Sequence, residues 1–256
     1  MHSSDLPTCY IRNLENSVCM AGSPMNDEGF PRIAEGTWPD GIEHQTLAGR
    51  RDVVVLLHGL FATTRSMQKA SQRLAAQGFD VVNWGYPTFL RSIEAHCEQL
   101  SSTLARLQND SSVRSVNFLT HSMGGILARY VIQQGSADKI RRMVMLAPPN
   151  AGSHLTRVSL GPFRKLLPAI SELTESPDGL PSTLRELRGV EVGVIAAARD
   201  LIVKVQNTIL PEQRDHRIVE GSHFALPKME QVLDLSLRFL CSGTFSDSFQ
   251  RQPIAA

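Results

Sequence analysis

Residues 115–125 read Ser-Val-Asn-Phe-Leu-Thr-His-Ser-Met-Gly-Gly, and the apolar stretch Ile126–Val131 follows. The run at 115–119 predicts a β-strand, and the residues after the two glycines can continue as a helix. A strand, a sharp turn and a helix, with Ser122 at the apex of the turn, are the context of a nucleophile elbow. In such an elbow the strained turn makes the serine hydroxyl project into solvent. Gly124 supplies the small residue that this turn needs, whereas Thr120 replaces the upstream glycine of G-x-S-x-G. The stretch therefore predicts a variant elbow, with a strand-to-helix turn without chemistry as the alternative.

Further strands and helices alternate on both sides of this elbow. Short apolar runs predict strands at 53–57, 79–84, 115–119, 142–147, 190–198 and 217–219. Helical spacing of apolar residues predicts helices at 66–77, 92–107, from the elbow to 134, and at 228–240. This alternation implies right-handed crossovers and an α/β fold, with a mainly parallel central sheet flanked by helices.

The chain divides into an arm, one large domain and a tail. Residues 1–45 are polar and lack periodicity, so we expect an N-terminal arm that is partly disordered. Residues 46–242 form the predicted α/β domain, and 243–256 a loose C-terminal tail. The alternation breaks down over 151–189, a proline-containing stretch that predicts a short lid or cap insert, with a plain surface connection as the alternative.

Composition excludes several classes of function. The 256 residues carry a formal net charge of +1, which gives no reason to expect a nucleic-acid partner. The 4 Cys and 8 His show no metal-like spacing, so we expect no metal site. We see no secretory signal and no apolar stretch of the ~20 residues that cross a bilayer. We therefore expect a soluble, cytoplasmic protein without integral membrane association, of unknown oligomeric state.

A serine nucleophile needs a base and a third group that orients the base. Asp200 directly follows the strand at 190–198, and His223 lies between the last strand and the last helix. Catalytic groups in open α/β sheets gather at the carboxyl ends of the strands, and the order Ser122, Asp200, His223 is the one expected for this elbow. The neighbouring Asp215-His216 pair and Glu220 are the alternatives. We expect the first two to form a surface turn before the last strand, and Glu220 is awkwardly close to His223.

The anionic intermediate of acyl transfer needs hydrogen-bond donors, and backbone N–H groups serve. One predicted donor is the N–H of Met123, which follows the serine. The second is expected in the loop His58-Gly59-Leu60-Phe61 after the first strand. Gly59 lets the backbone curl toward the site. Leu60 is the preferred donor and Phe61 the next choice. His58 is expected to shape this loop, and His121 to pack beneath the turn rather than act on the hydroxyl.

Five motifs in this order resemble the α/β-hydrolases of the lipase and esterase kind, in their bacterial single-domain branch. They are Leu-Leu-His-Gly-Leu at 56–60, Thr-His-Ser-Met-Gly-Gly at 120–125, Leu-Ala-Pro-Pro-Asn-x-Gly-Ser at 146–153, Asp-x-x-Val at 200–203 and Gly-Ser-His at 221–223. The resemblance covers roughly residues 50–242 and accommodates Thr120. It implies an α/β-hydrolase fold and a Ser/Asp/His hydrolase of carboxylic esters that uses no cofactor or metal.

We therefore expect a carboxylesterase or lipase that forms an acyl–Ser122 intermediate on a small-molecule ester or lipid substrate. His223 would act as base and then as acid, with Asp200 holding its tautomer. The acyl pocket is expected to be apolar and to favour short and medium chains. Its predicted lining comprises Leu60, Phe61, Met123, Leu155, Phe163 and Leu166, and packing onto the sheet is the alternative for the last three.

Four alternatives bear on this expectation. An acyltransferase or a thioesterase would use the same three residues, and the sequence does not separate these activities. A non-catalytic binding member of the fold would have no need to keep all three in order. A dehalogenase or epoxide hydrolase would carry Asp at the elbow, which Ser122 excludes. The loop after the first strand also lacks the G-x-G-x-x-G of dinucleotide-binding proteins.

Overall fold

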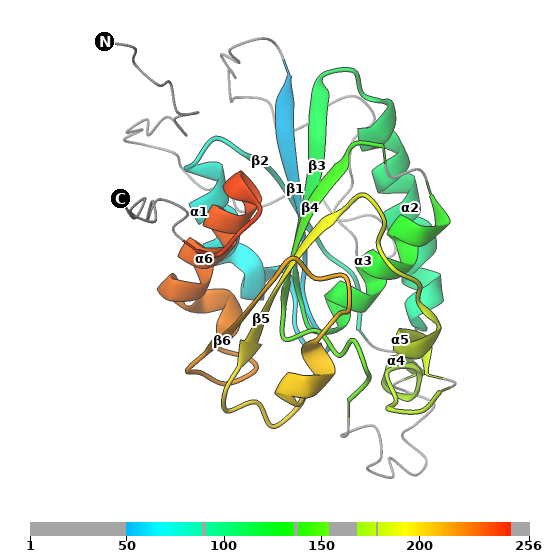
Figure 1. The fold of residues 1–256 in the computed structure, drawn as a ribbon. Coiled ribbons are helices and arrows are strands. Elements are labelled where there is room, and N and C mark those ends of the chain that lie inside the picture. The colour runs from blue at the N-terminus through cyan, green and yellow to red at the C-terminus, as the bar shows by residue number, and fades with distance from the viewer. Residues whose placement is uncertain (1–49, 89–90, 136–137, 154–167, 178, 247–256) are drawn as a thin grey trace, which may run out of the picture.

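A six-stranded sheet forms the centre of the protein in a computed structural model that describes residues 50–88, 91–135, 138–153, 168–177 and 179–246 (Figure 1). All five neighbouring pairs are parallel, and the spatial order is β2-β1-β3-β4-β5-β6. This confirms the predicted α/β class. The strands are β1 (Arg51–Leu57), β2 (Asp80–Trp84), β3 (Val113–His121), β4 (Ile140–Leu146), β5 (Glu191–Ala197) and β6 (Asp215–Val219).

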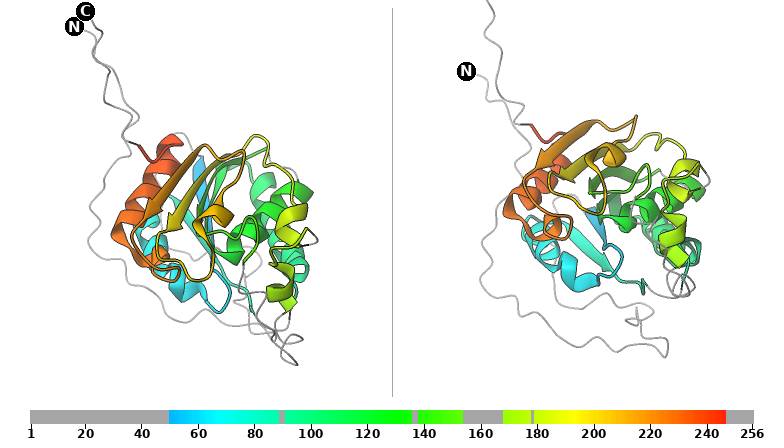
Figure 2. Two further views of the ribbon diagram at one scale, coloured as in Figure 1. Left: turned by 60° about the horizontal axis from the view of Figure 1, so that its bottom comes forward. Right: turned by 90° about the horizontal axis from the view of Figure 1, so that it is seen from below.

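Helices cover both faces of the sheet. Helices α2 (Ile93–Asn109) and α3 (Met123–Gln134) lie on one face. The opposite face carries α1 (Gln68–Ala75), the 3-10 turn η1 (Thr64–Met67) before it, and α6 (Glu230–Ser242) (Figures 1 and 2). Crossovers that place helices on both faces are what parallel strands require.

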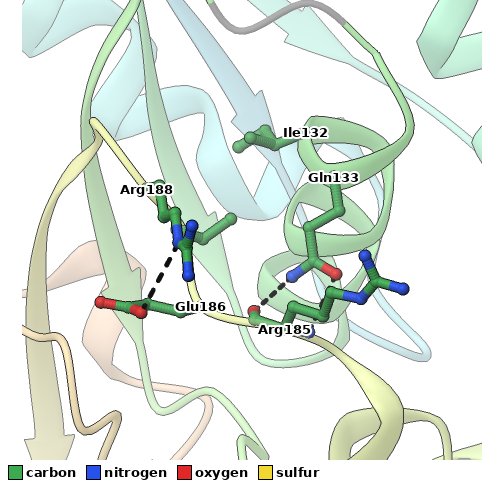
Figure 3. Close-up of a pocket in the computed structure, with 6 residues that line it drawn as sticks. Ile132, Gln133, Arg185, Glu186 and Arg188 are labelled. Atoms are coloured by element: carbon green, nitrogen blue, oxygen red, sulfur yellow. Dashed lines mark hydrogen bonds and ion pairs between the residues drawn. The ribbon is translucent and has the colours of Figure 1, made fainter.

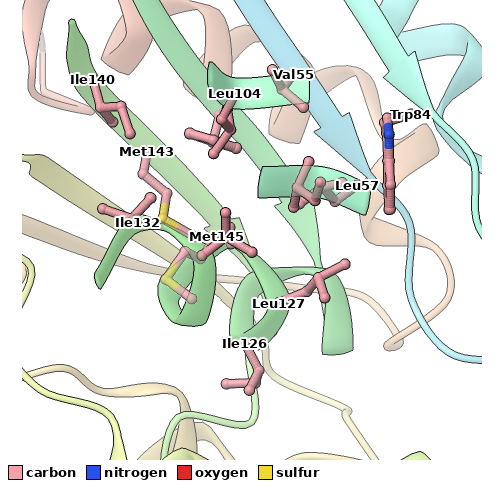
Figure 4. Packing of buried hydrophobic residues seen from close by; sticks show 14 of the residues in the cluster. Val55, Leu57, Trp84, Leu104, Ile126, Leu127, Ile132, Ile140, Met143 and Met145 are labelled. Carbon is pink, nitrogen blue, oxygen red and sulfur yellow. The ribbon is translucent and has the colours of Figure 1, made fainter. Parts of the chain in front are cut away.

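The all-apolar sequence of β1 follows from this double cover. Val53, Val55 and Leu57 pack toward α2 and α3, where Figure 4 shows their cluster. Val54 and Leu56 point the other way, into the cluster under α1 and α6. Successive strand residues face opposite sides, so a strand covered twice must be apolar at every position.

The helix ends follow local rules. Ser92 precedes α2, and its hydroxyl accepts a hydrogen bond from Ala95 N at 3.2 Å, which satisfies one free N–H of the first turn. Helix α6 is capped by Gly243, whose φ of 79° is the left-handed conformation that glycine adopts freely. Phe245 then returns to the core and packs against Phe239, although the sequence places both Gly243 and Phe245 in a C-terminal tail. The core therefore extends past α6.

The insert between β4 and β5 is described in part. It contains α4 (Pro168–Glu172) and α5 (Leu180–Thr183), and Leu173 after α4 is buried in the cluster with α2 and α3. Glu172 Oε2 accepts a hydrogen bond of 2.7 Å from Ile93 N at the start of α2. Residues 154–167 and the N-terminal arm at 1–45 lie outside the described residues. A lid role for 151–189 stays a prediction.

Two short 3-10 segments, η4 (Val205–Thr208) and η5 (Leu226–Lys228), complete the described elements. Within the described ranges, the longest helices are too short or too polar to span a lipid bilayer.

Candidate active site

The site is built where parallel strands end. The loops after β1, β3, β5 and β6 leave the sheet at its carboxyl edge, and they carry Leu60, Ser122, Asp200 and His223, respectively. This edge is where open α/β sheets place their ligands. The strand order thus brings together residues that are more than 160 positions apart in the sequence.

Ser122 occupies a strained turn between β3 and α3. Its φ of 52° and ψ of −123° are rare for a residue with a side chain. The turn is fixed by a hydrogen bond of 2.8 Å from Ser122 N to Leu146 O and another of 2.9 Å from Gly125 N to Ser122 O. Phe61 and Ala147 also have positive φ, and they follow the neighbouring strands β1 and β4. Backbone strain is thus concentrated at this edge of the sheet.

Of the two glycines after Ser122, Gly124 is required by the close approach of backbone atoms, whereas Gly125 lies against side chains. A Cβ atom at Gly124 would lie 2.6 Å from Leu57 O and 2.7 Å from His58 O. At Gly125 it would lie 2.6 Å from Met145 Cε and 3.3 Å from Thr120 Oγ1. The Thr120 side chain therefore lies beside Gly125, where a Cβ atom would make a tight contact with it.

Asp200 and His223 are in direct contact. His223 Nδ1 lies 2.7 Å from Asp200 Oδ2, and both side chains are almost fully buried. Asp200 Oδ1 accepts hydrogen bonds from the N–H groups of Ile202 at 2.7 Å and Val203 at 2.9 Å. Burial alone would raise the pKa of Asp200. The hydrogen bonds from His223, Val203 and Ile202 outweigh burial and hold this pKa below its usual value.

The contact fixes the form of the imidazole. An ionised carboxylate only accepts hydrogen bonds, so His223 Nδ1 carries the proton. In the neutral ring, Nε2 then has a free lone pair and can accept a proton. The chain of contacts reaches the elbow through His121, which precedes Ser122 and whose Nε2 lies 3.0 Å from His223 O.

The loop after β1 lies against the serine. A Cβ atom at Gly59 would be 3.0 Å from Ser122 Cβ, so the glycine is needed for this approach. The loop is braced by Tyr86, whose ring stacks on His58 with centroids 4.3 Å apart. The Tyr86 hydroxyl also donates to His58 O at 2.5 Å. Such contacts between distant segments leave no local sequence signal, and the sequence did not identify Tyr86.

The two candidate N–H donors of this loop differ. Phe61 N donates to Thr88 Oγ1 at 3.2 Å, so this N–H already has an acceptor. This favours Leu60 over Phe61, in line with the order of preference from sequence. Met123 is the first residue of α3, and its N–H has no acceptor within the helix. The positive end of the helix dipole also favours negative charge there.

The rival acids and bases have other partners. Asp215 and His216 lie within β6, so the prediction that they precede the last strand was wrong. Asp215 Oδ2 accepts hydrogen bonds from Thr244 Oγ1 and Phe245 N, and His216 Nε2 lies 3.1 Å from Thr208 Oγ1. The strand was placed too late because its polar residues carry no apolar signal.

Glu220 forms an ion pair with Arg199 at 3.4 Å, and both side chains are more than three-quarters exposed. Such an exposed pair contributes little to stability.

The Pro-Pro-Asn-x-Gly-Ser motif after β4 supports the Asp200 loop. Ser153 Oγ donates to Ile202 O at 2.6 Å, and the N–H of the same Ile202 donates to Asp200 Oδ1. Asn150 Nδ2 donates to Thr208 O at 2.7 Å. The motif thus has a structural role in fixing the segment that presents the carboxylate.

Three buried histidines near the site stay neutral. Burial lowers the pKa of His121 to about 3 and that of His96 to about 4, and it lowers that of His58 as well. In each case desolvation of the charged ring is the largest cause. In the unfolded chain each of these rings takes up a proton as the pH falls below about 6.5, whereas in the folded protein it stays neutral to lower pH.

We predict that the free energy of unfolding falls as the pH drops from about 6.5 to 4.5, by up to about 1.4 kcal/mol per pH unit for each of His121 and His96, and that His58 acts in the same direction. The unfolded state binds more protons over this range, so stability must rise with pH. Urea unfolding at pH 7, 6 and 5 measures the effect. Asp200 and the other carboxylates of lowered pKa reduce the free energy of unfolding only at lower pH. Glu172, whose pKa is raised by burial, has the opposite effect on stability. A stability that does not change between pH 7 and 5 would contradict the prediction.

A surface hollow of about 510 Å³ lies at the far end of α3 (Figure 3). It is lined by Ile132, Gln133 and residues 185–188. Ile132 is ten residues along the helix from Ser122, which is about 15 Å at 1.5 Å per residue. The hollow therefore does not serve the serine.

Of the predicted pocket residues, Phe61 is 56% exposed beside the site, Leu60 is partly buried and Met123 is buried. Leu155, Phe163 and Leu166 lie outside the described residues. Among the described residues, His, Cys, Asp and Glu form no group of three or more that could hold a metal ion.

Solved structures of lipases, esterases and a thioesterase share this architecture. The mature lipase BlEst2 of Bacillus licheniformis matches with a TM-score of 0.59 at 17% identity, over 80% of this chain and 96% of that chain. The metagenomic carboxyl esterase MGS0156 matches with a TM-score of 0.56 at 16% identity, over 76% and 71%. The type II thioesterase BorB from the borrelidin biosynthetic cluster matches with a TM-score of 0.53 at 17% identity, over 75% and 92%.

These identities are low, so the likeness concerns the fold, and it confirms the α/β-hydrolase fold that the sequence motifs implied. No protein of curated function matches the chain in sequence. The family model that matches, over residues 29–211, is described as a domain of unknown function, DUF7379. Because this match spans well over half of the chain, the protein belongs to the DUF7379 family, with the fold of the α/β-hydrolases.

Proposed function

We propose that the protein is a serine hydrolase that cleaves carboxylic esters through an acyl–Ser122 intermediate. The observation that carries this proposal is the hydrogen bond between Asp200 and His223 at the sheet edge where the strained Ser122 turn also lies. A buried carboxylate that fixes the tautomer of a histidine, next to an elbow serine, is the arrangement that activates a hydroxyl.

The proposed reaction has two halves. Ser122 Oγ attacks the ester carbonyl carbon while His223 Nε2 takes the hydroxyl proton. The tetrahedral intermediate then collapses, and His223 gives this proton to the leaving alcohol. Water attacks the acyl–Ser122 ester in the same way, with His223 again as base, and releases the acid. Asp200 stays ionised throughout and stabilises the imidazolium form of His223.

The negative oxygen of each intermediate is proposed to bind the N–H groups of Met123 and Leu60. Met123 N lies at the start of α3, and the Leu60 loop is held against Ser122 by Gly59. Losing one such donor typically costs about 2.7–4 kcal/mol of transition-state stabilisation. Both donors are backbone groups, so side-chain substitution does not remove them.

The structural neighbours support the reaction class. A lipase, a carboxyl esterase and a type II thioesterase share the fold, and each name concerns a reaction at an acyl group bound through oxygen or sulfur. The thioesterase makes hydrolysis of acyl thioesters the second candidate. We propose a small-molecule ester with a short or medium acyl chain as the substrate, with Phe61 beside the acyl group.

Labelling and turnover test the proposal together. A fluorophosphonate should label the native protein once, at Ser122, as read by mass spectrometry of the peptide, and heat-denatured protein should not react. A series of p-nitrophenyl esters from acetate to palmitate should be hydrolysed, with the best kcat/KM at the shorter chains. A matched acyl thioester gives the ratio of the two activities. Folded protein that neither reacts with the probe nor hydrolyses any ester or thioester would refute the proposal and favour a binding role.

A further inference from the structure

His121 connects the two halves of the candidate site. It is the last residue of β3, directly before Ser122, and its side chain is buried. Its Nε2 lies 3.0 Å from the backbone oxygen of His223, and the two imidazole rings are 4.8 Å apart between centroids. The residue that precedes the serine is thus bonded to the backbone of the histidine.

The geometry sets the protonation of His121. A carbonyl oxygen only accepts, so Nε2 must carry the proton and donate it. Nδ1 is buried and has no hydrogen-bond partner in the described part of the chain, and it packs against Gly59, where a Cβ atom would lie 3.0 Å away. A second proton at Nδ1 would find no acceptor there.

The surroundings keep the ring neutral. Burial and then the nearby His223 lower the pKa of His121 to about 3, and His58 acts in the same direction. The hydrogen bond to His223 O and the charge of Asp200 act in the opposite direction but do not outweigh these effects. His121 is therefore a neutral donor near neutral pH. It adds no positive charge beside His223 when that ring is protonated during the reaction.

This bond complements the one from Asp200. Asp200 binds Nδ1 of His223 and so fixes one edge of the imidazole ring. This bond does not hold the backbone of His223, which lies in the loop after β6. The bond from His121 fixes that backbone to the strand end that carries Ser122. One residue thus links the backbone of the base directly to the strand end that carries the nucleophile. A displacement of about 1 Å at a reacting group can cost about 100-fold in rate.

We propose that His121 is a positioning residue, which holds the His223 loop against the elbow through its Nε2–H bond to the His223 carbonyl. This inference rests on the proposed ester hydrolysis.

Three substitutions of His121 distinguish the effect of its hydrogen bond to His223 O from the effect of the volume of its ring. His121→Gln can place an amide nitrogen where Nε2 lies, His121→Asn can place one only near Nδ1, and His121→Phe keeps the ring without a donor. We expect His121→Asn and His121→Phe to lower kcat for an aryl ester about 10- to 100-fold with KM within about twofold. His121→Gln should stay within about threefold of wild type. Each variant is assayed well below its own Tm, with circular dichroism as the check on folding.

A second measurement does not depend on turnover. The proton on His223 Nδ1, held by Asp200, gives a low-field NMR signal when the ring is fixed. We expect this signal in wild type and His121→Gln, and its broadening or loss in His121→Asn and His121→Phe. Folded Asn and Phe variants with wild-type kcat and signal would overturn the inference, and so would an equal loss in all three variants. If wild type hydrolyses no ester and Ser122 takes no probe, the proposed function fails, and the NMR comparison alone decides the role of His121.

Discussion

Replacing Ser122 with alanine is expected to lower kcat for an aryl ester by about 10⁴- to 10⁶-fold, because the covalent route through the acyl–serine disappears. What remains is the stabilisation of the oxyanion by the backbone donors, which still act on attack by water. Alanine has the same Cβ as serine, so it meets the same strain at φ 52° and makes the same contact with Gly59. The fold and the Tm should therefore change little.

The matched control is Ser102→Ala. Ser102 lies on the exposed side of α2, where its hydroxyl donates to Glu98 O in the preceding turn. It should keep wild-type kcat and wild-type reaction with a fluorophosphonate. Steady-state kinetics, with the probe used to count active sites, gives the comparison. Ser122→Ala protein that retains wild-type turnover per molecule would show that another group performs the chemistry.

The sheet and the elbow could be predicted because their signals are local. The apolar run of β1 and the turn around Ser122 are each contained in about ten residues, and parallel strands then bring their carboxyl ends together. Asp200 and His223 could be proposed for the same reason, since each lies in the loop that follows a strand.

The remaining features depend on contacts between segments far apart in the sequence. His121 and the backbone of His223 are 102 residues apart, and a histidine before the elbow gives no sign of its partner. Thr88, which binds Phe61 N, lies in a loop after an edge strand, 27 residues away. Phe245 is buried although it follows the last helix in a polar stretch. Such contacts are set by packing, and neither periodicity nor turn chemistry encodes them.

Replacing Asp200 with asparagine is expected to lower kcat by about 10⁴-fold, the size of the loss when a Ser/His/Asp hydrolase has its histidine in the wrong tautomer. The structure dictates which way the amide must lie. Two backbone N–H groups, from Ile202 and Val203, donate to Oδ1 of Asp200, so this position must stay an acceptor. In the Asp200→Asn variant the amide oxygen would take this position, and the NH₂ group would then face His223.

An NH₂ group that faces Nδ1 makes this nitrogen an acceptor, so the proton of the neutral His223 ring moves to Nε2. A protonated Nε2 cannot take the proton of Ser122, and the negative charge that stabilises the imidazolium is gone as well. Kinetics on an aryl ester, with ¹⁵N NMR of His223 to identify the tautomer, tests both consequences. Asp215→Asn is the matched control, because Asp215 binds Thr244 and Phe245 instead. It should cost stability, about 1–3 kcal/mol, and leave kcat nearly unchanged. If the two variants lost activity equally, Asp200 would have no special role in orienting the base.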